Sequence, residues 1–129
     1  MSDQPPQGQE PTIRTIAMPA DTNSEGDIFG GWLMSQMDLA GGLAAARVAR
    51  GRVATVAVDA LQFLRPVKVG DEVTLFARLT AVGRTSIKIE VRAWRRPRFT
   101  EESEQVTAAT FTFVALDGDG RPRPVEVQA

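Results

Sequence analysis

A glycine pair, a single acid and an asparagine are the residues of this sequence best suited to chemistry. They lie in the stretch DTNSEGDIFGGWLMSQMDLAGG, residues 21–42, as Asn23, Gly30, Gly31 and Asp38. The first part of the stretch is a loop rich in Asp, Asn and Gly. The part after the glycine pair has helical, mainly apolar spacing. A carboxylate inside such an apolar helix requires an explanation.

The spacing of Gly31 and Asp38 gives the stretch a geometry. If the helix begins at the glycine pair, Gly30 and Gly31 place unpaired backbone N–H groups at its positive end. Asp38 then lies within about 20° of Gly31 around the helix axis, on the same face of the helix, but about 10 Å further along the axis. The amides could hold an oxygen that gains negative charge, and the carboxylate could direct water or attack the same carbon. This distance favours either a substrate that lies along this face of the helix or a second subunit that completes the site.

Each of these residues also has an ordinary structural alternative. Asp38 could point to solvent or cap a neighbour, and Gly30–Gly31 could form only a tight turn into the helix. Asn23 could form its own Asx turn. Asp59 is a second carboxylate on an otherwise apolar strand, and it could hydrogen-bond across a dimer seam.

The composition narrows the possible chemistry. The chain has 129 residues and a formal net charge of -1, and it contains neither Cys nor His. Thiolate zinc sites, cysteine nucleophiles and Ser-His-Asp triads are therefore excluded, and no metal site is expected. Acid–base chemistry must come from carboxylates, Lys or oriented water. The low net charge argues against nucleic-acid binding, and no apolar run approaches the roughly 20 residues of a membrane helix.

One helix and about five strands are predicted to position these residues. The helix runs from near Gly31 to about Ala49, where Gly51 is a stop signal, and its small residues predict close packing on a sheet. Strand-like alternation marks residues 12–18, 53–64, 72–82, 85–95 and 105–116, the first of them as an edge strand. Because no βαβ alternation occurs, we predict an α+β fold, an antiparallel sheet with a single helix against one face.

The whole chain is interpreted as one domain. The domain spans residues 12–125, after a leader of residues 1–11 and before a tail of residues 126–129. The leader, MSDQPPQGQEP, is polar and Pro/Gln-rich and does not resemble a secretory signal peptide. We therefore predict a disordered leader and a cytoplasmic protein.

Four stretches of this sequence closely resemble the hotdog-fold acyl-CoA thioesterases. They are residues 18–42, GRVATVAVDALQFLRPVKVGD, VGRTSIKIEVRAW and TFTFVALDGDGRPRPV. The resemblance is to broad-specificity bacterial acyl-CoA hydrolases, related to the tandem-hotdog cytosolic enzymes of animals, and covers about residues 12–125. It implies a long helix wrapped by an antiparallel sheet. It also implies homodimers whose active sites lie at the interface, and these dimers often assemble further into hexamers, as trimers of dimers. It also implies hydrolysis of acyl-CoA to free fatty acid and CoA, with no metal and no cofactor apart from the CoA of the substrate.

The resemblance also implies roles for individual residues. Asp38 matches the catalytic acid on the central helix, and whether it is a general base or a direct nucleophile stays open. The amide at Gly30 or Gly31 matches the group that polarises the thioester carbonyl. Asn23 matches a loop residue that binds or orients the water or the carbonyl.

Docking of the CoA phosphates is expected from basic residues on the third long strand. Arg84, Ser86 and Lys88 begin the polar face of that strand, and Arg and Lys suit phosphate oxygens. The alternative is a solvated polar face. Further basic candidates, without ranking, are Arg65, Arg95 and Arg96.

Two other functions are compatible with this kind of fold. A hotdog dehydratase or hydratase relies on His with a carboxylate, and the absence of His argues strongly against it. A non-catalytic acyl-CoA-binding sensor or a scaffold is the alternative that the sequence leaves open.

Overall fold

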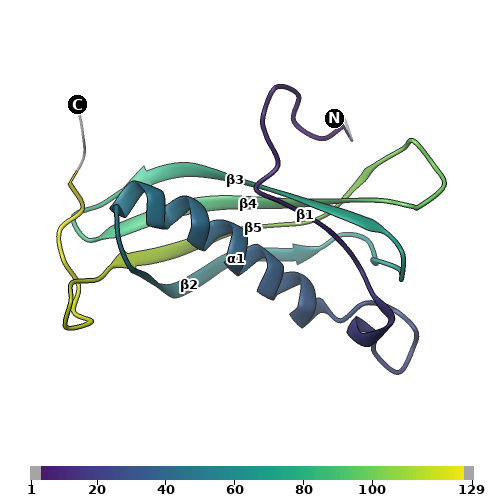
Figure 1. Ribbon diagram of the computed structural model, residues 1–129, viewed down its shortest axis with the longest axis horizontal. Helices are drawn as coiled ribbons and strands as arrows, with labels where there is room; N and C mark the ends of the chain where they lie inside the picture. The colour runs from purple at the N-terminus through teal and green to yellow at the C-terminus, as the bar shows by residue number, and fades with distance from the viewer. Residues whose placement is uncertain (1–3, 127–129) are drawn as a thin grey trace.

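The structure, a computed structural model, describes residues 4–126 (Figure 1). In chain order the elements are β1 (Ile13–Ile16), η1 (Pro19–Asp21), α1 (Gly30–Ala49), β2 (Val53–Phe63), β3 (Glu72–Val82), β4 (Ser86–Arg96) and β5 (Glu104–Ala115). Residues 1–3 of the predicted leader and 127–129 of the predicted tail lie outside the described residues. The domain limits themselves stay a prediction.

The five strands form one antiparallel sheet in the order β1-β3-β4-β5-β2. The helix α1 crosses one face of this sheet (Figure 1). The predicted α+β architecture is confirmed, and every predicted strand limit lies within two residues of the observed one. β1 lies at one edge, as expected, and β2 lies at the other edge. Among residues 4–126, one side of β2 therefore has no neighbouring strand.

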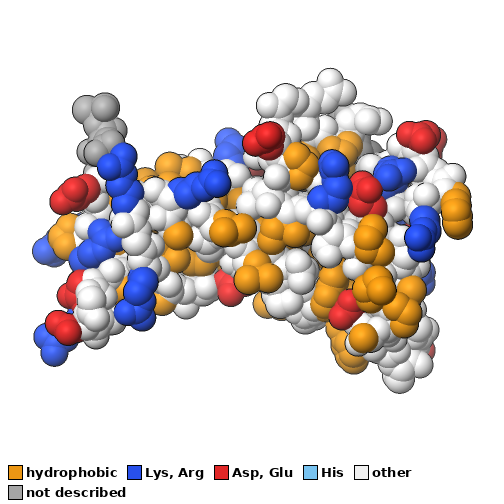
Figure 2. Space-filling view, in the orientation of Figure 1, with side chains coloured by type: hydrophobic (Ala, Val, Ile, Leu, Met, Phe, Trp, Pro, Cys, Tyr) orange, Lys and Arg blue, Asp and Glu red, His pale blue; other side chains and the backbone are white. Residues whose placement is uncertain are grey.

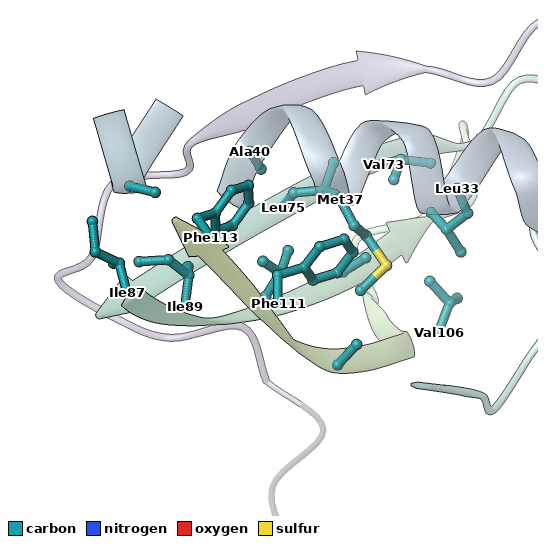
Figure 3. Packing of buried hydrophobic residues seen from close by; sticks show 14 of the residues in the cluster. Leu33, Met37, Ala40, Val73, Leu75, Ile87, Ile89, Val106, Phe111 and Phe113 are labelled. Carbon is teal, nitrogen blue, oxygen red and sulfur yellow. The ribbon is translucent and has the colours of Figure 1, made fainter. Parts of the chain in front are cut away.

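The core lies between α1 and the inner face of the sheet (Figure 3). β4 contributes the alternating set that the sequence predicted for the helix-facing side, Ile87, Ile89, Val91 and Ala93, and all four are fully buried. From the helix, Leu33 and Met37 reach the same layer. Burying each large apolar side chain stabilises the fold by about 1.5–3 kcal/mol, so this layer holds α1 on the sheet.

The close packing predicted for α1 is confirmed at one of its two central glycines. A Cβ atom on Gly41 would lie 3.1 Å from the ring of Phe113 and 3.3 Å from Cγ2 of Val91. A Cβ atom on Gly42 would lie 3.8 Å from the nearest atom of Phe113. Gly41 therefore lets the helix approach the sheet, whereas Gly42 lies on the half-exposed side of the helix.

The edge strand β2 is irregular at two points. Its pairing with β5 shifts between Thr55 and Ala57 and again between Asp59 and Gln62. At the second shift Ala60 has a φ of 54°, a backbone conformation that favours glycine. Beyond this bulge, the end of β2 lies beside the start of α1, where a Cβ atom on Gly30 would be 3.1 Å from the ring of Phe63.

None of the helices formed by residues 4–126 is both long and apolar enough to cross a bilayer. The longest, α1, has an arginine in its last turn and an aspartate near its middle.

Candidate active site

The start of α1 borders a groove with a volume of about 420 Å³. Its apolar wall includes Phe29, Leu33, Phe63 and Leu64, and its polar wall includes Asn23. Phe63 lies so close to the helix that a Cβ atom at residue 30 would be 3.1 Å from the tip of its ring. A larger residue at position 30 would have to shift that ring, so Gly30 leaves room for Phe63 beside the helix amides.

The amides at the start of α1 are available as hydrogen-bond donors. Trp32 and Leu33 donate their N–H groups to the carbonyl of Phe29, at 3.1 and 3.3 Å, and no side chain caps the helix. Within residues 4–126, the N–H groups of Gly30 and Gly31 have no acceptor. They therefore form the donor pair expected from the sequence, at the positive end of a 20-residue helix.

Asn23 lies on the groove, and its side-chain oxygen is already used. Oδ1 accepts the backbone N–H groups of Glu25 and Asp27, at 2.9 and 3.1 Å. The Asx-type turn that we considered as the structural alternative is therefore present. Because the turn uses Oδ1, the side-chain amide nitrogen of Asn23 is the group with which this residue could bind a ligand.

Asp38 does not line this groove. It is exposed on the side of α1 that faces β2, where its Oδ1 accepts a 2.5 Å hydrogen bond from the hydroxyl of Thr55. Gly31 is also exposed, with open space beside it. The protomer thus brings Asn23 and Gly30 together and presents Asp38 separately, on the surface next to the free edge of β2.

Sequence reasoning missed Thr55 and the two apolar groove residues at the end of β2. A threonine in a strand is an ordinary residue, and only the packing of β2 against α1 gives its hydroxyl a carboxylate partner. Phe63 and Leu64 are half exposed, at 50% and 52%, at the end of a strand that the sequence shows only as mainly apolar. No local pattern distinguishes such residues from buried ones.

The basic residues predicted to dock CoA lie away from the groove. Arg84 lies in the β3–β4 turn and Ser86 begins β4, and the N–H of Val125 donates to the carbonyl of Arg84 at 2.8 Å. Lys88 is exposed on the outer face of β4. In Figure 1 this turn lies beside the C-terminal end of α1, whereas the groove borders the other end of the helix.

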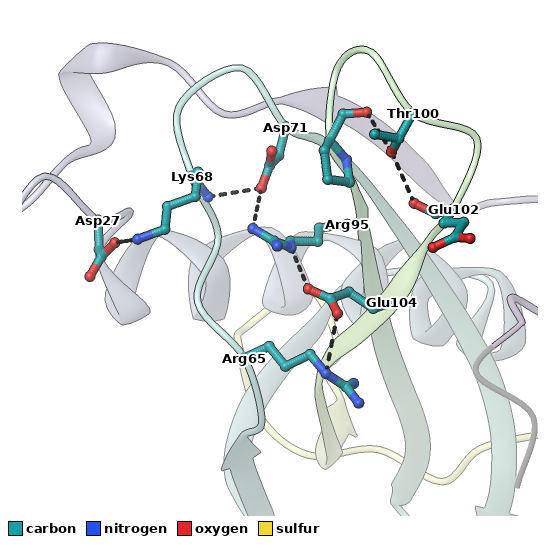
Figure 4. Close-up of polar contacts among 9 residues, drawn as sticks. Asp27, Arg65, Lys68, Asp71, Arg95, Thr100, Glu102 and Glu104 are labelled. Atoms are coloured by element: carbon teal, nitrogen blue, oxygen red, sulfur yellow. Dashed lines mark hydrogen bonds and ion pairs between the residues drawn. The ribbon is translucent and has the colours of Figure 1, made fainter.

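Arg65 and Arg95 belong to an ion-pair network beside the groove (Figure 4). Asp71, only 4% exposed, accepts from Nη1 of Arg95 at 3.0 Å and from the backbone N–H of Lys68 at 2.9 Å. Glu104 contacts Nε of Arg95 at 2.7 Å and Nε of Arg65 at 3.3 Å. The network ties the segment between β2 and β3 to β4 and β5. Both arginines therefore have a structural role, and Arg65 also lines the groove.

Comparison with known proteins agrees with this architecture. A family model described as the thioesterase superfamily matches residues 25–100. The acyl-CoA thioester hydrolase YciA of Salmonella typhimurium is 53% identical, over 98% of this chain and 96% of the relative. The chain belongs to the thioesterase superfamily.

Solved structures of this superfamily share the hotdog fold. A hexameric broad-specificity acyl-coenzyme A thioesterase, crystallised as a variant with an aspartate replaced by alanine, is 48% identical with a TM-score of 0.87. The match covers 92% of this chain and 87% of that one. The resemblance deduced from the sequence motifs is thereby confirmed at the level of family and fold.

A second solved member of the thioesterase superfamily bears on the individual residues. Structures of an acyl-CoA hydrolase from Staphylococcus aureus include one variant with an asparagine and another with an aspartate replaced by alanine. The asparagine variant is 30% identical to this chain with a TM-score of 0.84, covering 89% of this chain and 69% of that one. The two replaced residues have the same spacing in that chain as Asn23 and Asp38 have here.

Proposed function

We propose that this protein is an acyl-CoA thioester hydrolase that releases a free fatty acid and CoA. The observation that carries the proposal is the groove in which Asn23 and the free amide of Gly30 meet an apolar wall. Such a groove suits an acyl thioester, because a carbonyl needs donors and an acyl chain needs apolar surface. The names of the relatives, acyl-CoA thioester hydrolases and thioesterases, support the same substrate class.

The proposed site is assembled from two protomers. Asp38 lies about 10 Å along α1 from Gly31, too far for both to act on one carbonyl without help. Asp38 also lies beside the free edge of β2, where Val56 is 57% exposed, and on the same helix Leu39 and Leu43 are exposed. Figure 2 shows hydrophobic side chains spread over the face of the molecule that carries α1. A dimer formed through β2 covers part of this surface and brings the Asp38 of one protomer toward the amides of the other.

The proposal includes a homodimer, assembled further as a trimer of dimers. The hexameric state of the relative described above supports this assembly. No metal or separate cofactor takes part, because CoA enters as part of the substrate and leaves as product. We also propose a cytoplasmic location, which imaging of a tagged protein in intact cells tests.

In the proposed reaction the amides of Gly30 and Gly31 stabilise the thioester oxygen as negative charge develops on it. Asp38 then acts in one of two ways. As a general base it takes a proton from water, whose oxygen bonds to the acyl carbon while the carbon–sulfur bond breaks. As a nucleophile it forms an anhydride with the acyl group, which water then hydrolyses. In both routes one water is consumed, and the CoA thiolate leaves and is protonated.

The test is release of CoA thiol from acetyl-CoA to palmitoyl-CoA by the native protein and by Asp38→Ala. We expect hydrolysis by the native protein and none by the variant at equal mass and melting temperature. Asp119→Ala, at an exposed turn, is the matched control and should retain full activity. A native protein that binds acyl-CoA without releasing thiol would instead be the non-catalytic sensor or scaffold.

A further inference from the structure

The outer face of the sheet, the face away from α1, carries two buried aromatic side chains. Phe76 of β3 and Trp94 of β4 are only 5% and 3% exposed, and their rings meet edge to face with centroids 5.6 Å apart. The strand register places both on this face, because Thr74 pairs with Trp94 and Phe76 with Arg92, while the residues that alternate with them fill the core. A segment other than α1 must therefore cover this aromatic pair.

The N-terminal leader lies across this face. Gln4 lines a hollow formed by the loop between β4 and β5 and the residues that adjoin it. Pro6 and Gln9 line a cleft of about 220 Å³ beside Phe76, and the side-chain amide of Gln9 donates to the carbonyl of Ala77 at 3.5 Å. The leader therefore runs from the β4–β5 loop to β3, and it crosses the aromatic pair on the way. We call this cleft the outer cleft.

The rim of the outer cleft is polar. Oε1 of Glu90 lies 3.2 Å from Nη2 of Arg78 and 3.1 Å from Nε of Arg92, and all three residues line the cleft. One carboxylate thus holds two guanidinium groups in place beside the ring of Phe76. Aromatic-lined grooves of this kind bind extended proline-rich segments, whose polyproline II conformation is set before they bind.

The leader itself has the composition of such a segment. Its sequence, MSDQPPQGQEP, contains Pro5, Pro6 and Pro11. Pro5 and Pro6 are both half-buried in the structure. Because proline fixes φ near −65°, a proline pair loses little conformational entropy when it docks. The leader is therefore an intramolecular ligand of the outer cleft.

The leader leaves one group of the aromatic pair unsatisfied. Nε1 of Trp94 is buried and has no hydrogen-bond acceptor among residues 4–126. A buried donor without an acceptor costs about 1–3 kcal/mol. A polyproline II segment makes no internal hydrogen bonds, so its carbonyl groups are free to accept one. A segment that places a carbonyl on Nε1 regains this energy, and the leader does not.

We propose that the outer cleft is a docking site for an extended proline-rich segment of another protein, which displaces the leader. Trp94 donates its indole N–H to a backbone carbonyl of that segment, and Phe76 packs against its proline rings. The tethered leader competes for the cleft and lowers the apparent affinity for the partner. The inference does not depend on the proposed function, because the groove borders α1 and the outer cleft lies on the opposite face of the sheet.

The first test uses the indole N–H groups as reporters. The chain contains two tryptophans, Trp32 and Trp94, so each protomer gives two indole signals in a nitrogen–proton NMR spectrum, and Trp94→Phe assigns them. Titration with an oligoproline peptide should shift the signal of Trp94 and leave that of Trp32 unchanged. A glycine–serine peptide of equal length should shift neither. A Trp94 signal that oligoproline leaves unchanged, even when the leader is loosened as described next, would overturn the inference.

The second test removes the competitor. Replacing Pro5 and Pro6 together, as Pro5→Gly with Pro6→Gly, makes the leader flexible and should raise the affinity for oligoproline about tenfold in calorimetric titration. Pro124→Gly, at an exposed position outside the leader, is the matched control and should bind as the native chain does. An unchanged affinity in the double variant would mean that the leader does not occupy the binding site, and would refute the proposed competition.

The third test concerns the donor itself. Trp94→Phe keeps an aromatic ring and removes the N–H, so it should weaken oligoproline binding about tenfold. Trp32→Phe is the same replacement on α1 and should bind as the native chain does. Equal affinity of Trp94→Phe and the native chain, with both variants folded by their melting temperatures, would refute the assigned hydrogen bond.

A free peptide with the leader sequence, DQPPQGQEP, separates a foreign partner from a second copy of this chain. It should bind the double leader variant more weakly than oligoproline does, because the leader leaves Nε1 without an acceptor. Binding of the leader peptide without binding of oligoproline would show a cleft specific for this chain's own leader, and the inference would fail. None of these measurements uses acyl-CoA, so they remain decisive if the native protein proves to release no thiol.

Discussion

At the scale of single residues, the hydroxyl of Thr55 fixes one oxygen of the proposed catalytic carboxylate. Thr55→Val keeps the shape of the side chain and removes the donor to Asp38. We expect kcat for acyl-CoA hydrolysis to fall about 10–100-fold, because a hydrogen bond to a charged group contributes about 1.5–3 kcal/mol. Initial rates at saturating substrate measure this effect. Thr55→Ser keeps the donor and should retain most of the activity, and a loss as large as that of Thr55→Val would show that the effect does not come from the hydrogen bond to Asp38.

Ala60 is a residue whose replacement should stabilise the protein. Its φ of 54° places an L side chain in the left-handed region, at the bulge of β2. Ala60→Gly should raise the free energy of unfolding by about 0.5–1 kcal/mol, because relief of this strain exceeds the entropy that glycine loses. Chemical denaturation measures the change. Ala54→Gly, in a regular part of the same strand, should destabilise instead, and stabilisation by both would argue against strain at Ala60.

At the scale of elements, the segment between β2 and β3 is fixed by one buried carboxylate. Asp71 is 4% exposed and pairs with Arg95 at 3.0 Å, so Asp71→Ala leaves a half-buried guanidinium without this partner. We expect the free energy of unfolding to fall by about 3 kcal/mol. Lys68→Ala removes an exposed ion pair with Asp27 from the same segment and should cost less than about 1 kcal/mol. Equal losses in denaturation midpoint would contradict the distinction between buried and exposed pairs.

The elements themselves could be predicted from the sequence because their hydrophobic periods are regular. β4 shows this best, since Ile87, Ile89 and Val91 alternate with polar residues and the observed burial follows the same alternation. The bulges of β2 and the bond from Thr55 to Asp38 could not be predicted. Both depend on which strand pairs with which and in what register, and a local pattern contains no information on that.

At the scale of the candidate site, the sequence motif predicted the residue types but not their grouping. Asn23 and Gly30 share the groove because one loop leads directly into the helix. Asp38 is separated from them by two turns of α1, and its exposure follows from the position of β2 at the edge of the sheet. No sequence pattern shows on which side β2 lacks a neighbouring strand. Only the fold therefore indicates that a second protomer is needed.

At the scale of the whole molecule, the free edge of β2 and the exposed apolar side chains near it predict an assembly on which activity depends. Val56 is 57% exposed on this strand. In a two-fold dimer, Val56→Arg buries two like charges near one seam, which is costly unless they are paired. We expect the variant to elute as a monomer with native circular dichroism and to lose hydrolysis, because each groove lacks the partner's Asp38.

Light scattering coupled to size-exclusion chromatography, with CoA release measured on the same fractions, tests this dependence. Phe99→Arg is the matched control, since Phe99 is 94% exposed in the loop between β4 and β5 and the added charge is the same. The control should remain at least dimeric and active. A Val56→Arg monomer with full hydrolysis would mean that one protomer holds the whole site. A Val56→Arg dimer with full hydrolysis would mean that the interface between the protomers lies elsewhere.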